Sequence, residues 1–137
     1  MIVFNFETGF SLLNQKEISK WIGDIILEEN LNHQEINYIF CNDDYLLEKN
    51  IKYLNHKELT DIITFDYSTG KWLSGDIFIS IERVADNAVL YNVDMEDELH
   101  RVMAHGVLHL CGYKDKSEKE KALMRDKEDY YLSLRTF

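Results

Sequence analysis

The hydrophobic positions of the chain recur with two different periods, and each period predicts a kind of element. Short, β-branched apolar runs predict strands over residues 2–6, 36–41, 61–67 and 76–81. Helical spacing predicts helices from Asn14 to about residue 29, from Asp43 to Leu54, over 82–92, from Asp94 to Gly112, and over about 118–134. Strands and helices are mixed, with helices covering a small sheet, so the predicted class is α+β.

Polar residues at the predicted helix ends support these boundaries. The expected N-terminal caps are Asn14 with Glu17, Asp43, Asp94, and Ser117 with Glu120. Gly112 is the expected residue just past the end of its helix, where a left-handed conformation stops the helix.

Composition adds limits on the class of protein. The 137 residues suit a single domain over 1–137, and 45% hydrophobic residues without any proline leave no linker. No apolar run reaches the length of a membrane span, and the start MIVFNFETGF lacks the basic region of a signal peptide. We therefore expect a cytoplasmic protein in which Cys41 and Cys111 are reduced and buried.

Two histidines at i and i+4 are the strongest candidate for chemistry. His105 and His109 fall within about 40° of each other on the helical wheel, at the border of the apolar stripe. Two neutral imidazoles so placed can bind one Zn²⁺, and Asp115, three residues past Gly112, can fold back as a third ligand. Three protein ligands leave a fourth position for water, whose pKa the metal would lower to near 7.

Simpler interpretations stay open for the same residues. The histidine pair could consist of partly buried hydrogen-bonding groups, and Glu98 with Arg101 could be a surface pair. Gly106 follows the first histidine, so the glutamate base of an HExxH peptidase is missing. A glycine inside a helix indicates close approach by another element or a substrate, or simply tight packing of the helix on the sheet.

The stretch HGVLHLCGYKD, residues 105–115, resembles the H-G-x-L-H-L-x-G-Y-D-H signature of the YbeY family of metal-dependent endoribonucleases. TDIITFD (60–66) and SGDIFIS (74–80) are similar to two further segments of that family, so the resemblance covers most of residues 60–115. It implies a zincin-like fold in which a small mixed sheet packs against helices, with a central metal-binding helix and usually zinc. It also implies cleavage of single-stranded RNA in ribosomal RNA maturation, at the end of the small-subunit RNA, and a part in ribosome biogenesis and quality control.

Two departures from the family pattern bear on the chemistry. The family's third ligand is a histidine, whereas this chain has Asp115; a carboxylate should make a bound water less acidic and could favour Mn²⁺ over zinc. An arginine that many relatives carry before the T-D segment corresponds to Leu54. The nearest replacements are Lys52, His56 and Lys57, which could equally be solvated loop residues.

The resulting hypothesis is metal-assisted cleavage of a phosphodiester bond, with metal-bound water or the RNA 2′-hydroxyl as nucleophile. The net charge of −10 counts against a broad nucleic-acid surface, so we expect a local cluster of Lys49, Lys52, Lys57 and Arg101 beside the cleft. Two rivals remain: a metal-dependent hydrolase of peptides or small molecules, and a non-catalytic ribosome-associated factor, which a fourth protein ligand on the metal would favour.

Overall fold

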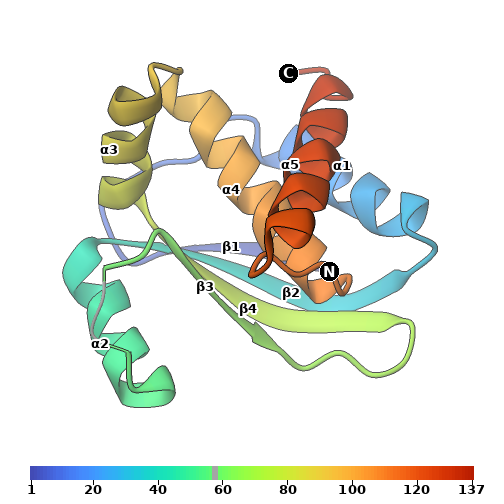
Figure 1. Ribbon diagram of the computed structural model, residues 1–137, viewed down its shortest axis with the longest axis horizontal. Helices are drawn as coiled ribbons and strands as arrows, with labels where there is room; N and C mark the ends of the chain where they lie inside the picture. The colour runs from blue at the N-terminus through green and yellow to red at the C-terminus, as the bar shows by residue number, and fades with distance from the viewer. Residues whose placement is uncertain (57–58) are drawn as a thin grey trace.

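The computed structural model describes residues 1–56 and 59–137, so Lys57 lies outside the described part of the chain. Its elements, in order, are β1 (Ile2–Phe6), α1 (Gln15–Glu28), β2 (Asn32–Cys41), α2 (Asp43–Leu54), β3 (Ile62–Asp66), β4 (Trp72–Ser80), α3 (Ile81–Tyr91), α4 (Met95–Leu110) and α5 (Glu118–Ser133) (Figure 1). Every predicted strand and helix is present, and the predicted α+β class is confirmed.

The sheet is mixed and has the strand order β1-β2-β4-β3. β1, β2 and β4 run parallel, and β3 is antiparallel to β4 at the edge. β2 and β4 start earlier than predicted, at Asn32 and Trp72, which pair with each other. The reason is that backbone pairing extends both strands through polar positions that carry no apolar alternation.

Helices cover both faces of this sheet. In Figure 1, α1, α4 and α5 lie on one side, with α4 between the sheet and α5, and α2 lies on the other side. The main core fills the first side, and the side chains at its centre are Ile18, Ile22, Ile25, Tyr38, Phe40, Ile77, Ile79 and Met103. A smaller cluster of Cys41, Leu46 and Ile63 lies under α2.

Buried hydrogen bonds tie the layers together. The Tyr38 hydroxyl of β2 donates to the backbone carbonyl of Met103 in α4 at 2.8 Å. The Trp21 indole of α1 donates to the carbonyl of Tyr131 in α5, also at 2.8 Å. Because buried polar groups are costly without a partner, these bonds help to fix how α4 and α5 sit on the sheet.

Gly106 marks the closest approach of α4 to the sheet. A Cβ atom at this position would lie 2.9 Å from Ile62 Cδ1 and 2.9 Å from Ile77 Cγ2. The glycine is thus explained by tight packing of the helix on β3 and β4. Gly112 has a φ of +108° and ends the turn after α4, as predicted.

The helix caps confirm one capping box and correct three predicted caps. Asp94 stands at the N-cap position of α4, but its side chain makes no capping bond. Ser117 and Glu120 form the predicted capping box of α5. Asn14 instead adopts a left-handed conformation, and its side chain makes no capping bond.

At α2 the cap is Asn42, whose side chain accepts from the Tyr45 amide at 2.9 Å. Asp43 does not cap the helix because its carboxylate accepts from the Ser80 hydroxyl, at 2.7 Å, and from Arg83.

Two further predictions concern the burial of the cysteines and membrane-spanning segments. Cys41 is fully buried, whereas Cys111 is only partly buried; both are free thiols. In the described part of the chain, no helix combines the length and apolarity needed to cross a membrane.

Candidate metal centre

The last two turns of α4 and the turn that follows bring three possible metal ligands together. His105 and His109 lie with ring centroids 4.5 Å apart, and Asp115 folds back toward both. Its Oδ2 is 3.2 Å from His105 Nε2 and 3.3 Å from His109 Nε2. The ligand atoms of the three residues all lie within 4.8 Å of one another. The structure therefore assembles the group that the sequence predicted.

Hydrogen bonds on the far side of each ring favour metal binding. His105 Nδ1 lies 2.7 Å from Glu128 Oε2, and His109 Nδ1 lies 2.9 Å from the carbonyl oxygen of Tyr113. Each acceptor holds a proton on Nδ1, so that Nε2 of the neutral ring presents a lone pair toward Asp115. Two lone pairs facing a carboxylate repel it unless a cation or proton lies between them.

The spacing also fits a metal ion. Two ligand atoms at about 2.0–2.1 Å from a tetrahedral ion lie about 3.3 Å apart, close to the two distances from Asp115 Oδ2. Two imidazoles and a carboxylate form a donor set that suits zinc and other divalent transition metals. A His/His/Asp group of this kind could hold one metal ion.

The surroundings of His105 favour positive charge. Burial opposes protonation of the ring, but the hydrogen bond with Glu128 and the carboxylates of Asp115 and Asp61 outweigh it and raise the pKa. The same negative potential that raises the pKa would stabilise a bound cation.

A salt-bridged cluster holds the turn that carries Asp115. The Tyr113 hydroxyl donates at 2.6 Å to Oε1 of Glu29, the residue directly after α1, while the Tyr113 carbonyl faces His109. Glu29 also accepts from Tyr131 and from Lys127 Nζ. Burial raises the pKa of Glu29, but these three donors lower it by more, so the carboxylate stays charged. The turn is thus fixed to α1 and α5 rather than free to swing.

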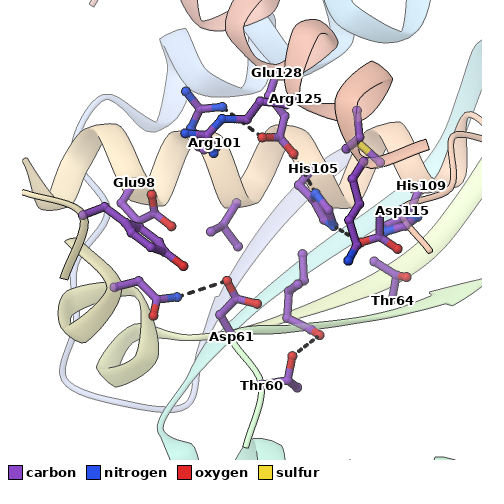
Figure 2. Close-up of a pocket in the computed structure, with 16 residues that line it drawn as sticks. Thr60, Asp61, Thr64, Glu98, Arg101, His105, His109, Asp115, Arg125 and Glu128 are labelled. Atoms are coloured by element: carbon purple, nitrogen blue, oxygen red, sulfur yellow. Dashed lines mark hydrogen bonds and ion pairs between the residues drawn. The ribbon is translucent and has the colours of Figure 1, made fainter. Parts of the chain in front are cut away.

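The three possible ligands lie in a cavity of about 500 Å³ between β3, α3, α4 and α5 (Figure 2). Its ionisable lining consists of the carboxylates Asp61, Glu98, Asp115 and Glu128, the cations Arg101, Lys121 and Arg125, and the two histidines. The cavity therefore carries charges of both signs around the candidate metal position.

Two further carboxylates that line the cavity have raised pKa values. For Asp61, burial raises the pKa and the Glu128 and Asp115 charges add to it, although His105 acts in the other direction. For Glu98, burial and the Asp61 charge raise the pKa against the effect of Arg101 and Arg125.

Comparison with known proteins agrees with these features. The profile of the family described as endoribonuclease YbeY matches residues 4–135 of the chain. The chain belongs to the YbeY family.

YbeY relatives match over nearly their whole length. "Endoribonuclease YbeY" of Flavobacterium johnsoniae is 56% identical over 134 residues, covering 98% of this chain and 96% of the relative. The protein of the same name from Cytophaga hutchinsonii is 54% identical over 135 residues, covering 98% and 94%. A solution structure of a Thermotoga maritima protein has a TM-score of 0.67 at 25% identity, covering 97% of this chain and 87% of that one. The YbeY fold, with the helix that carries the possible metal ligands packed on the sheet, is thus the fold of this chain.

The structure corrects the predicted partner of Arg101. Glu98 is buried and Arg101 does not pair with it. Arg101 instead forms ion pairs with Glu128 at 2.9 Å and with Asp129 at 2.6 Å. The predicted surface pair of Glu98 and Arg101 is therefore wrong, because α5 covers this side of α4.

Of the other predicted RNA-binding residues, those that the structure describes lie apart from the candidate metal. Lys49 and Lys52 lie on α2, across the sheet, with their ammonium groups over the rings of Tyr45 and Tyr53. The structure does not bring either lysine to the cavity lining. His56 lines a neighbouring cavity of about 420 Å³, which shares Thr60, Ile62 and Thr64 with the first.

Four charged lining residues were not singled out from the sequence as part of the site. Asp61 stands in the T-D segment but was not assigned a role. Lys121, Arg125 and Glu128 lie on α5 at i, i+4 and i+7, a spacing that places them along one face of the helix. From the sequence, this spacing indicates that the three residues share a helix face, but it does not indicate which other helix that face packs against.

Proposed function

We propose that this chain is a metal-dependent endoribonuclease that cleaves single-stranded RNA during ribosomal RNA maturation, including the end of the small-subunit RNA. The observation that carries the proposal is the group of His105, His109 and Asp115, set in a cavity whose rim carries arginine and lysine. Membership of the YbeY family, whose curated relatives are named endoribonucleases, supports the reaction class.

The three-ligand group suits a catalytic rather than a structural metal. In the described part of the chain, no fourth His, Cys, Asp or Glu joins the three. Structural zinc sites use four protein ligands, whereas catalytic sites use three and keep one position open. A bound Zn²⁺ or Mn²⁺ would supply Lewis-acid activation at the phosphodiester.

The chain's own residues prepare the site for that chemistry. Glu128 and the Tyr113 carbonyl orient the two imidazoles through Nδ1, so that both Nε2 atoms point into the cavity. Asp115 adds a negative charge that a third histidine would not add, which favours harder divalent metals more than an all-histidine site would. Arg101, Lys121 and Arg125 offer positive charge to the phosphates of the RNA.

The proposal also includes the domain that acts, its location in the cell and its RNA substrate. Residues 1–137 act as one metalloprotein domain, in the cytoplasm, on RNA of the small ribosomal subunit. Lys52 and His56 remain candidates for contacts with RNA that extends beyond the metal cavity, His56 through the neighbouring cavity.

Metal content and RNA cleavage, measured on the same untagged preparations, test the proposal. We expect about one zinc or manganese per chain and cleavage of single-stranded but not duplex fragments of ribosomal RNA. Asp115→Ala should lower metal occupancy and cleavage together, while Asp126→Ala, an exposed change on α5 outside the cavity, should leave both unchanged.

Other outcomes identify the rivals. Full cleavage by metal-free protein would overturn the proposed mechanism. One metal per chain without RNA cleavage would favour a ribosome-associated factor, and hydrolysis of peptides instead of RNA would favour another hydrolase.

A further inference from the structure

Two cations of α5 face the metal cavity. Lys121 and Arg125 are separated by one helical turn and share their side of α5 with Met124 and Glu128, which are buried against α4. Figure 2 shows Arg125 on the same side of the cavity as Arg101 and Glu128. Both cations are themselves exposed, so a ligand entering the cavity can reach them.

Neither of these two residues forms an ion pair with another described residue of the protein. Among the described residues, neither Lys121 nor Arg125 has an ion-pair partner within 4.0 Å. Arg101 differs, because its two terminal nitrogens, Nη1 and Nη2, already form ion pairs with Glu128 and Asp129. The cavity therefore contains one cation that is committed to the fold and two that are available.

The charge balance of the cavity indicates an anionic ligand. Its four carboxylates outnumber its three cations by one, and a divalent metal at the histidine group would make the lining net positive. An anion bound beside the metal and the two cations would offset this net positive charge. A chain of phosphodiesters supplies such an anion at regular spacing.

We propose that Lys121 and Arg125 form a phosphodiester-binding site on α5 that holds the RNA backbone next to the bond that is cleaved. The inference deepens the proposed nuclease function and rests on it. Arginine suits this position because its planar guanidinium can bind two phosphate oxygens at once, and lysine suits it as a mobile point charge. The site differs from the metal ligands in that its loss should weaken RNA binding without removing metal.

Binding of a cleavage-resistant strand tests the site. The probe is a short fluorescein-labelled, single-stranded 2′-O-methyl phosphorothioate RNA, titrated with metal-loaded full-length protein at several salt concentrations. For the double variant Lys121→Ala/Arg125→Ala we expect binding weaker by about 100-fold, roughly tenfold per lost charge contact. The slope of log K against log[salt] should become shallower by about 1.4, because each neutralised phosphate contributes about 0.7 for single strands.

A matched control keeps the same change in net charge. Lys16→Ala/Lys119→Ala removes two exposed lysines, one on α1 and one on α5, that do not line the cavity. We expect this control to bind with a nearly unchanged salt slope, and Arg125→Lys to keep the salt slope of the parent protein while losing part of the affinity, because lysine keeps the charge but not the two-point contact. Metal content should stay at one per chain in every variant.

Three outcomes would overturn the site. Unchanged affinity and slope in the double variant, with cleavage of RNA by the parent protein, would remove the site and leave the nuclease function standing. Equal losses in the double variant and its control would mean a general effect of charge. A parent protein that loads metal but neither binds nor cleaves single-stranded RNA would overturn the proposed function, and the site with it.

Discussion

Two histidines of α4, five residues apart, occupy opposite kinds of environment. His100 is 4% exposed, and its ring lies edge-on to Trp21 and Phe137, with centroids 6.1 and 5.1 Å away. Arg135 donates to its Nδ1 at 2.7 Å. His105 lies in the metal cavity, where Glu128 and Asp115 face its two nitrogens.

The pKa values of the two rings move in opposite directions. Burial and the Arg135 charge lower the pKa of His100 to about 4, although Asp97 acts against them. At His105 burial also lowers the pKa, but the hydrogen bond and charge of Glu128, with Asp115 and Asp61, raise it overall. The neighbours, and not burial, decide the difference.

The comparison explains why one end of α4 can form a metal site and the other is core. An arginine beside His100 fixes a neutral ring as an acceptor and excludes further positive charge. Carboxylates beside His105 orient the ring and favour a cation at Nε2. The same residue type on one helix is therefore suited to a structural role or to metal binding according to the charges that face it from other elements.

Replacing His105 and His100 separately should give the largest difference in metal content and in the rate of RNA cleavage. His105→Ala should remove most of the bound metal and lower RNA cleavage by more than about 100-fold, because a direct ligand matters at least as much as the groups that orient it. His100→Gln, which keeps an acceptor for Arg135, should retain metal and cleavage. Metal content per chain and initial cleavage rates check both; similar losses in the two variants would contradict the division of roles.

Glu128→Gln changes the charge beside His105 and keeps its shape. The amide oxygen can still accept from Nδ1, but the negative charge that supports the ring and pairs with Arg101 is lost. We expect metal affinity to fall by about 10- to 100-fold. A competition titration with a zinc chelator measures the change. Glu118→Gln, an exposed change on the same helix, is the control and should have no effect.

Gly106 sets the distance between the sheet and the part of α4 that carries His105. Gly106→Ala should lower the free energy of unfolding by about 1–3 kcal/mol, because the new Cβ would meet Ile62 and Ile77. Gly23→Ala on α1 has open space around it and should raise the free energy of unfolding by roughly 0.5–1 kcal/mol. Urea denaturation of both variants checks the pair, and stabilisation of Gly106→Ala would contradict the close packing.

The local parts of this site could be predicted from the sequence. His105 and His109 share a helical face, and Gly112 turns the chain so that Asp115 returns over it. All of these relations lie within eleven residues, where helix geometry and turn chemistry decide the arrangement. The capping box of Ser117 and Glu120 was predictable for the same reason.

The tertiary parts could not be predicted. Glu128 reaches His105 from 23 residues away, and Lys121 and Arg125 enter the cavity only because α5 packs on α4. Lys52 is close to the T-D segment in sequence, yet α2 lies on the other side of the sheet. Charge and spacing along the chain did not reveal which helix faces meet, so the partner of Arg101 was assigned to its own helix.

The last prediction concerns the pH dependence of stability at His100. With a pKa of about 4 in the folded protein and 6.5 in the unfolded chain, the unfolded state binds more protons between these values. The contribution of His100 to the free energy of unfolding is therefore fully present above pH 6.5 and is lost as the pH falls toward 4. We expect His100 to contribute about 2 kcal/mol of this loss, allowing for screening by solvent around the partly exposed Arg135.

The comparison with His100→Gln isolates this contribution, because Gln does not titrate. The raised pKa values of Asp61 and Glu98 act in the opposite direction at acid pH, but they are common to both proteins and cancel in the difference. Urea denaturation at a series of pH values, with metal removed from both proteins, should show the free energies converging or crossing as the pH falls. A constant difference from pH 7 to pH 4 would mean that His100 takes up its proton as readily in the folded as in the unfolded state, and the contrast between the two histidines would then be lost.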